Sequence, residues 1–451
     1  MAQFRIDRNS ITPKGFLRRV FDSGFDEVRD PREQTKTIHP LGAVLRLAVL
    51  ALASGARSAR AVEDRSEHLK PQVRAEIGIH ERVSDNAFGL ILGRLDGKEF
   101  RGALHRQVKA EWERKRLQAE RLPQNTVAID GKHLATISEK RLRALISHQT
   151  PLNGDELTAE QLRQVLGTQF PCVQLHESEG GRVYGLVRVH RATLISSDAA
   201  VVIDQWPLQG KTNEMGTIET TLKALFSVYG RTKMIEMLTL DAGNASASVA
   251  HLLRSRGVDY FLTLKSGQGR LHQRALEKLE RLEGSEAVFT TCTEERGKTI
   301  CYTVWRHLLD VDMGWKDAAE IVRVERVVAG DEEVTVGNRY FVTSDDEMDA
   351  SDALQLARAH WRCENEGHWT ADAIWDEDAR RTPWTQHPDG VLVVGILRAI
   401  AINILAVLRA LSRIQEGLKS IKPTWKTTIE QALLVLCEPL LDMEAFNDLE
   451  A

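Results

Sequence analysis

The chain has 451 residues, a formal net charge of −4, 42% hydrophobic residues and 27% charged residues. These values exclude a disordered or fibrous protein and indicate a large globular protein with an ample buried core. The cysteines are odd in number and form no Cys-x-x-Cys pair, which argues against a disulfide framework or a zinc ribbon and suits a reducing cytoplasm. The N-terminus lacks the apolar region of a signal peptide. The five cysteines are Cys172, Cys292, Cys301, Cys363 and Cys437.

Apolar residues recur at helical spacing from about 38 to 120, and no strand pattern interrupts them. The residues 83–89 open one of these helices with a polar cap. We therefore predict an all-helical N-terminal domain over 1–121, which ends at a Leu-Pro break. The two most apolar stretches of the chain, 41–54 and 391–408, are each broken by an arginine, so we predict buried helices there rather than membrane spans, and no membrane partner.

The pattern changes to an α/β one from 122 to 285. The segment between Asp241 and Lys265 has a strand–helix–strand pattern. A stretch at about 134–180 has its own helix signal, a capping box at Thr158 and Gln161, and is either an added DNA- or dimer-contacting element or a solvated decoration. The predicted strands are 126–129, 183–189, 199–203, 234–240 and 260–264, and the main predicted helices are 214–227 and 245–257.

Strand patterns dominate again from 286 to 345, which predicts a β-rich insertion that interrupts the core rather than extending it. The residues 346–420 return to helix, and a C-terminal tail, 421–451, is helical to about 440. The strands predicted in the insertion are 287–292, 300–306, 320–329, 334–336 and 339–343.

Three acidic residues stand in settings that suggest chemistry. Asp130 and Asp241 each follow a short apolar run, and Glu364 lies in a helix-like stretch where His360, Glu364, His368 and Asp372 would share one face at i, i+4 spacing. Singly, an acid after a strand is more often a turn residue or a helix cap. Together, the three predict a site for a hard divalent cation, because such cations take oxygen ligands brought together by the fold.

The ordered motifs around these acids resemble those of the DDE transposases of bacterial insertion sequences, in particular the branch of the H-repeat-associated proteins. The resemblance covers about 30–410. There is one clear departure from the family, the long connection between the first acid and the next strand, 183–189. The matching segments are Ile129–Lys132, Lys211–Glu214, Asp241–Ala242 with Asp259–Lys265, His360–Trp369 with Glu377, Asp378 and Arg380 or Arg381, and Leu397–Ile404.

The resemblance implies a ribonuclease-H-like catalytic core, with the β-rich insertion placed before the third acid. It implies that Asp130, Asp241 and Glu364 are the catalytic acids and bind two Mg²⁺ ions, with Mn²⁺ as an alternative and Asp130 bridging the pair. Glu366 is the rival to Glu364. On an α-helix the two point about 200° apart, and the family places its acid directly before Asn365.

Side chains near the acids are predicted to contact DNA. Lys132, Lys211, Lys265 and Arg380 are candidates for holding phosphates. His360 and His368 would contact phosphate or orient the carboxylate, although interior packing explains them equally well. Trp361 and Trp369 would each stack on an unpaired base. Core packing is the more common role for such a residue.

The negative net charge requires that any DNA contact be local, because affinity depends on which phosphates are neutralised. The helix-like segment 101–121, which contains Arg114, Lys115 and Arg116, is predicted to contact phosphates on the side of the metal site, together with Lys140, Arg141 and Arg143. Both clusters also fit ordinary solvated faces.

Three functions are compatible with these features: a transposase that cuts insertion-sequence ends and joins them to target DNA, a metal-dependent nuclease without strand transfer, and an inactive DNA-binding remnant. The three acids argue against the third, and the helical N-terminal domain, a candidate for end recognition, favours the first. The implied partners are double-stranded DNA, as terminal inverted repeats and target, and a second copy in an active homodimer. The implied location is the cytoplasm, at the nucleoid.

Overall fold

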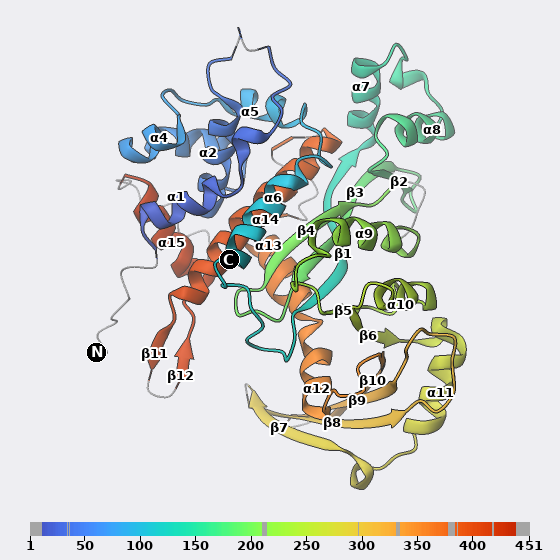
Figure 1. The fold of residues 1–451 in the computed structure, drawn as a ribbon. Coiled ribbons are helices and arrows are strands. Elements are labelled where there is room, and N and C mark those ends of the chain that lie inside the picture. The colour runs from blue at the N-terminus through green and yellow to red at the C-terminus, as the bar shows by residue number, and fades with distance from the viewer. Residues whose placement is uncertain are drawn as a thin grey trace.

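The structure is a computed structural model that describes residues 11–438 apart from 34, 36, 210–213, 296, 331–333, 378–383, 386 and 417–418, and apart from the side chains of 214, 365–367, 414–416 and 419–420. A long twisted sheet runs through the molecule, with a helical region at one end and a β-rich region at the other (Figure 1).

Among the described residues of the N-terminal region, the regular secondary structure is helical, apart from an isolated bridge between Leu69 and Cys437. Side-chain oxygens of Thr12, Ser58 and Ser84 accept backbone N–H groups at three helix starts, which explains where those helices begin. The helices are α1 (Pro13–Phe21), α2 (Leu41–Ala53), α3 (Ala59–His68), α4 (Pro71–Ile77), α5 (Asp85–Leu92) and α6 (Arg101–Glu113).

The pattern of the basic segment 101–121 suggested one helix, but the structure shows that the helix covers only part of it. Helix α6 ends at Glu113, where Lys115 adopts a left-handed conformation with φ 57° and its N–H bonds back to the carbonyl of Trp112 at 2.8 Å. The three cations at 114–116 therefore follow the helix instead of lying on its face.

The apolar stretches 41–54 and 391–408 are buried helices, as predicted. Helix α14 (Pro388–Leu411) packs against α2, α5, α6 and the sheet, and the C-terminal helix α15 (Trp425–Leu436) covers it. Among the described residues, α14 is the one helix long and apolar enough to cross a membrane, and its apolar stretch is entirely buried inside the protein. One hydrophobic cluster thus joins the N-terminal helices, α14 and one face of the sheet.

The central sheet has the strand order β2-β3-β1-β5-β6-β10-β9-β8-β7, with β4 paired to β3. Strand β1 pairs antiparallel with β3 and parallel with β5, and β5 pairs parallel with β6. Helices α9 (Glu214–Tyr229) and α10 (Ala247–Arg254) provide the connections around the parallel strands. The strands of this part are β1 (Thr126–Ser138), β2 (Val173–Glu177), β3 (Val183–Leu194), β4 (Val201–Pro207), β5 (Met237–Leu240) and β6 (Asp259–Leu264).

The predicted β-rich insertion extends the central sheet, contrary to the expectation that it interrupts the core. Strand β10 pairs antiparallel with β6, since the backbone edge of β6 would otherwise lie unpaired. Helix α11 (Gly269–Leu279) covers one face of the added strands and α12 (Ala350–Ala359) the other. The strands are β7 (Phe289–Glu295), β8 (Lys298–Leu308), β9 (Glu320–Ala329) and β10 (Val334–Thr343), so the two short strands predicted at 334–343 are one.

A disulfide joins Cys292 and Cys301, which face each other across β7 and β8. Cysteine number and spacing argued against a disulfide framework, and this single bond links two neighbouring strands without forming one. Strand pairing brings the two residues together, and their sequence separation of 9 gives no hint of it.

The extra segment after the first acid is an ordered unit with a small core of its own. Strand β1 runs on to Ser138, and helices α7 (Glu139–Gln149) and α8 (Ala159–Gln169) follow. The predicted capping box is present, because Thr158 accepts the N–H of Gln161 and the Gln161 side chain accepts the N–H of Thr158.

Candidate active site

Two of the predicted acids occupy neighbouring positions at the point where the parallel pairing of β1 with β5 ends. Ile129 of β1 is paired with Leu240 of β5. Asp130 and Asp241 are the residues that directly follow this pair in the sequence. Ala128 and Met237, two and four residues before these acids, lie on the sheet face that α12 covers. Since side chains alternate along a strand, Asp130 and Asp241 are directed to that same face.

The third acid reaches this face from a helix that changes its winding. Helix α12 ends at Ala359, a π-helical turn spans Cys363–His368, and helix α13 (Trp369–Trp375) follows. The prediction of one continuous α-helix with an i, i+4 row is therefore wrong, because the wider turn shifts the phase of every residue after it. Cys363 packs with Ala128 and Met237, which places the turn against the acid-bearing face.

Electrostatics link the three acids. Burial raises the pKa of the Glu364 carboxyl, the Arg339 guanidinium opposes that rise, and the charge of Asp241 adds to it. Burial also raises the pKa of the Cys363 thiol, with Asp130 and Glu364 acting in the same direction. Among the described residues, however, no three His, Cys, Asp or Glu side chains are drawn together closely enough to hold a metal ion as they stand.

Three buried histidines surround the acids, and burial lowers the pKa of each. Nδ1 of His368 lies 3.5 Å from a carboxylate oxygen of Asp130, and Nδ1 of His360 lies 3.2 Å from the Thr239 hydroxyl. The pKa falls to about 4 for His360 and for His190, which bonds Thr221 at 2.9 Å. The imidazoles are therefore neutral at pH 7, and Nε2 of His190 and of His368 has no hydrogen-bond partner among the described residues.

Buried ion pairs support the floor of the site. Lys132, predicted to hold phosphate, is buried and forms an ion pair with Asp372. Arg191, which is paired across the sheet with Asp130, binds both carboxylate oxygens of Glu377 at 2.8 and 2.9 Å, and both side chains are fully buried. The positive charge of Lys132 is thus balanced by Asp372 within the protein.

An open cavity of about 700 Å³ lies beside Asp241, at the carboxyl ends of β5 and β6. Lys265, another predicted phosphate contact, is exposed and lines it together with Asp241. Gln268 holds the loop that follows, because its amide donates to the carbonyl oxygens of Ala242 and Ala245. Lys265 is therefore free to reach a ligand bound next to Asp241.

The other predicted DNA contacts are more scattered. Arg114 binds Asp22 at 2.7 Å and Glu111 at 2.8 Å, Arg116 is half-buried with Glu111 3.9 Å away, and Lys115 is exposed. Lys140 and Arg141 are exposed on α7, whereas Arg143 bonds Glu139 and the carbonyls of Gly154 and Leu157. Lys211, Arg380 and the side chain of Glu366 lie outside the described residues.

The two tryptophans have different surroundings. Trp361 is half-buried, and the guanidinium carbon of Arg339 lies 4.3 Å from the centre of its ring. One face of Trp361 is thus occupied by a cation and not open to a base. Trp369 is 64% exposed, so core packing does not explain it.

Sequence reasoning missed three residues of this site. His190 and Arg191 lie on β3 opposite Gly131 and Asp130, and Arg339 lies on β10 near Glu364. A histidine and an arginine within an apolar strand were a usable signal, since such residues are rarely buried without a partner. Nothing local to Arg339 indicates its place.

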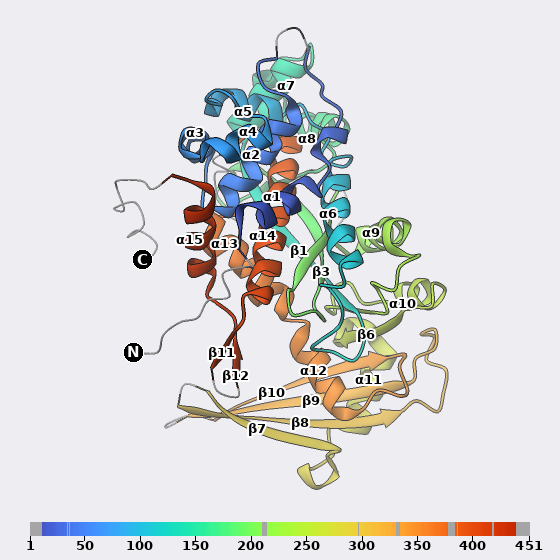
Figure 2. The same ribbon diagram turned by 60° about the vertical axis from the view of Figure 1, so that its left-hand side comes forward.

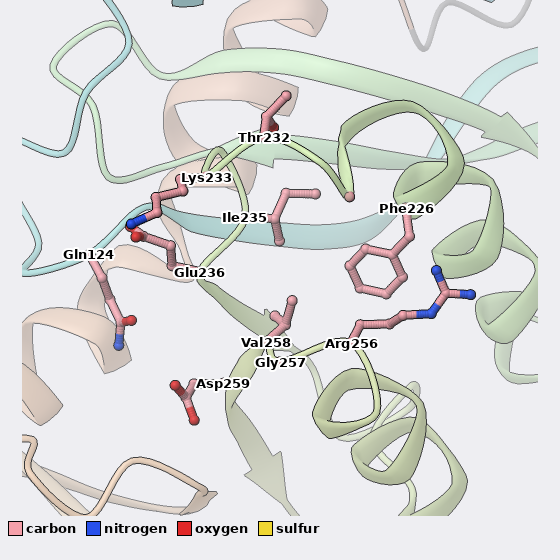
Figure 3. Close-up of a pocket in the computed structure, with 11 residues that line it drawn as sticks. Gln124, Phe226, Thr232, Lys233, Ile235, Glu236, Arg256, Gly257, Val258 and Asp259 are labelled. Carbon is pink, nitrogen blue, oxygen red and sulfur yellow. The ribbon is translucent and has the colours of Figure 1, made fainter.

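A second pocket, of about 380 Å³, lies at the opposite ends of the parallel strands (Figure 3). Its carboxylates are satisfied within the protein. Glu236 accepts the backbone N–H and the side-chain amide of Asn125 at 3.0 and 2.8 Å, and Asp259 forms an ion pair with Arg254. It contains none of the predicted site residues.

The fold and the site define an α/β protein with an acidic centre at the carboxyl ends of parallel strands, a type of centre that suits hard divalent cations. The chain belongs to the family described as Transposase DDE domain, whose profile matches residues 123–404, and a DDE_Tnp_1-associated profile matches residues 23–108.

Curated relatives agree with this family. The chain is 25% identical over 230 residues to "Putative transposase YncI" of Escherichia coli O157:H7, and 28% identical over 232 residues to "H repeat-associated putative transposase YhhI" of Escherichia coli strain K12. Each match covers 48% of this chain, and 56% and 58% of the respective relative, so the chain spans little more than half the length of these proteins. The resemblance to the H-repeat-associated branch is confirmed.

Proposed function

We propose that the protein is a transposase that cleaves phosphodiester bonds at the ends of an insertion sequence and transfers the 3′ ends to target DNA. The observation that carries the proposal is the placement of Asp130 and Asp241 one residue beyond the paired Ile129 and Leu240, with Glu364 in electrostatic contact. The implied substrates are terminal inverted repeats and target DNA, handled by a homodimer because two ends must be joined together.

We further propose that the core is ribonuclease-H-like. Three antiparallel strands, β4, β3 and β1, are followed across the sheet by the parallel strands β5 and β6. This arrangement supports the proposal, because it places one acid on the first strand and the next on the neighbouring parallel strand, as the family resemblance implies.

The side chains present fit Mg²⁺, with Mn²⁺ as the alternative. Asp130, Asp241 and Glu364 offer oxygen ligands, and burial keeps the nearby Cys363 thiol protonated, so no thiolate competes. Two bound ions would stabilise the attacking and leaving oxygens of an in-line phosphoryl displacement.

The chain's own residues would prepare this site. His368 beside Asp130 orients that carboxylate, and the buried pair of Arg191 and Glu377 fixes the strand that Asp130 faces. Lys265 lies in the cavity next to Asp241, where it can neutralise a phosphate. Neutral His360 and His368 add no positive charge that would repel a cation.

The test is cleavage and joining of duplex DNA that carries the sequences bordering the gene, in Mg²⁺. Asp130→Asn, Asp241→Asn and Glu364→Gln should each abolish cleavage while DNA binding persists, since phosphate contacts elsewhere remain. Glu366→Gln is the control and should stay active. Near-normal nicking by any of the three acid variants would remove that residue from the site, and cleavage without joined products would identify a nuclease instead.

A further inference from the structure

Three exposed arginines lie together on the β-rich part of the sheet. Arg326 is on β9, Arg339 on β10 and Arg358 in the last turn of α12. Among the residues that the structure describes, none of the three forms an ion pair, whereas the neighbouring Arg323 and Arg306 bind Glu325 and Glu320. Arg326 and Arg339 are close neighbours on adjacent strands, because Arg326 is paired with Gly337, two residues before Arg339.

Aromatic rings hold these arginines in place. The guanidinium carbon of Arg339 lies 4.3 Å from the ring centre of Trp361, and that of Arg358 lies 4.9 Å from the ring centre of Tyr302. Nε of Arg326 donates to the Tyr302 hydroxyl at 3.3 Å. A guanidinium stacked on a ring uses its face, which leaves the N–H groups at its edge directed to a ligand.

This set, the arginine–aromatic row (Arg326, Arg339, Arg358, Tyr302 and Trp361), lies on the same face of the sheet as the acids. Val304, Val324 and Phe341 lie two residues from Tyr302, Arg326 and Arg339 on β8, β9 and β10, so they share their face, and they pack under α12. The row continues that face past the end of α12, which Figure 2 shows lying along these strands. Trp361 is three residues before Glu364, and Arg339 is the cation that acts on the Glu364 carboxyl.

We propose that the arginine–aromatic row binds the sugar–phosphate backbone of a DNA strand as it passes Glu364. The ligand is a polyanion because the three like charges repel one another, and the Glu364 carboxylate, which acts on Arg339, does not balance all three. A strand backbone presents phosphates in series, which matches arginines contributed by three different elements, and each fork can bind one phosphate with two N–H groups. The inference rests on the proposed function for its choice of DNA as the polyanion.

The alternative is that these arginines only keep the sheet surface soluble. Solubilising charges on a sheet are usually interspersed with charges of opposite sign. Here the two pairs formed by Arg306 and Arg323 are balanced, and the three unbalanced cations are the ones stacked on rings near Glu364. Fixed stacking also restricts side chains that a merely solvating role would leave mobile.

The experiment is a salt titration of binding to a short duplex of arbitrary sequence, because phosphate contacts carry no sequence information. We compare the wild type with the triple variant Arg326→Gln, Arg339→Gln, Arg358→Gln. Three lost contacts at about 0.9 each should reduce the slope of log affinity against log salt by about 2.7. The matched control, Arg274→Gln, Lys278→Gln, Arg281→Gln, removes the same charge on and just after α11, on the opposite face, and should leave the slope unchanged.

A second variant, with lysine at the same three positions, keeps the charge but cannot stack and fork in the same way. It should recover most of the slope at lower affinity than the wild type, and the melting temperatures of both variants check that neither has unfolded. Equal slopes for the wild type and the glutamine variant, or equal losses in the variant and its control, would overturn the inference.

The binding experiment distinguishes a failure of this surface from a failure of the proposed function. Loss of binding in the glutamine variant, combined with no cleavage by the wild type in Mg²⁺, would sustain this surface and reject the transposase. Normal binding and cleavage by the glutamine variant would reject this surface and sustain the transposase. A wild type that binds no duplex even at low salt would reject the DNA surface.

Discussion

The acidic side chains at the two ends of the parallel strands β1, β5 and β6 have different surroundings. At the amino ends, Glu236 accepts hydrogen bonds from Asn125, and Asp259 forms an ion pair with Arg254 (Figure 3). At the carboxyl ends, Glu364 has a raised pKa, partly because of Asp241, and the nearest histidines are neutral. Asp130 and Asp241 accept hydrogen bonds from Gly131 and Asn244, but these bonds leave their negative charges in place, and a bound cation would relieve the repulsion between them. The difference marks the carboxyl ends as the working end of the sheet.

The largest effect should come from the buried pair under the acids. Glu377→Gln leaves the fully buried Arg191 without a counter-charge, so the free energy of unfolding should fall by about 3–5 kcal/mol. The matched change at the amino ends, Arg254→Gln, breaks partly exposed pairs with Asp259 and Asp317 and should cost about 1 kcal/mol or less. Denaturant unfolding measures both. Similar losses at the two ends would remove the contrast.

Acid should weaken the carboxyl end before the amino end. The folded-state pKa of His190, about 4, lies below its unfolded value of 6.5, so the unfolded chain binds the proton more readily. The contribution is complete above pH 6.5 and is lost as the pH falls toward 4, by up to about 3 kcal/mol. Unfolding free energies at several pH values should show this fall, and His190→Asn should flatten it. An equally steep fall in the variant would assign the effect to other groups.

The smallest expected effect is an increase in stability. In the absence of metal, Glu364→Gln should raise the free energy of unfolding by up to about 1 kcal/mol, because it removes a charge disfavoured by burial and by Asp241. At the other end, Glu236→Gln should lower it by about 1 kcal/mol, since it weakens hydrogen bonds from Asn125.

Mg²⁺ sharpens the same comparison, because a ligand that binds only the folded state stabilises it. It should raise the melting temperature of the wild type and of Glu236→Gln, but not that of Glu364→Gln. A gain in Glu364→Gln as large as in the wild type would place the ion elsewhere.

Local patterns were enough for much of the fold. Strand β9 lies at the residues where alternation put it, 320–329, and the run ending at Leu240 places Asp241 at a strand end. The capping box at Thr158 is a local signal that the structure reproduces. These features depend on neighbours in sequence, which is why they could be predicted.

The remaining features depend on partners far away in the chain. The pairing of β10 with β6 and the disulfide arise only when strands meet. The π-helical turn at 363–368 defeats an argument based on 3.6-residue periodicity. The basic segment 101–121 gave no sign that Arg114 would bind Asp22, 92 residues earlier. The catalytic roles of the acids stay predictions.

The position of α14 bears on how the protein is made. The helices between 11 and 113 leave the ribosome long before residues 388–411, against which α2, α5 and α6 pack. Until then, the surfaces of α2, α5 and α6 that pack on α14 stay uncovered, and the nascent chain presents them to chaperones and proteases. A gene copy that is cut short anywhere before α14 therefore yields a fragment prone to degradation, and such truncated copies would not accumulate as competitors of the full-length protein.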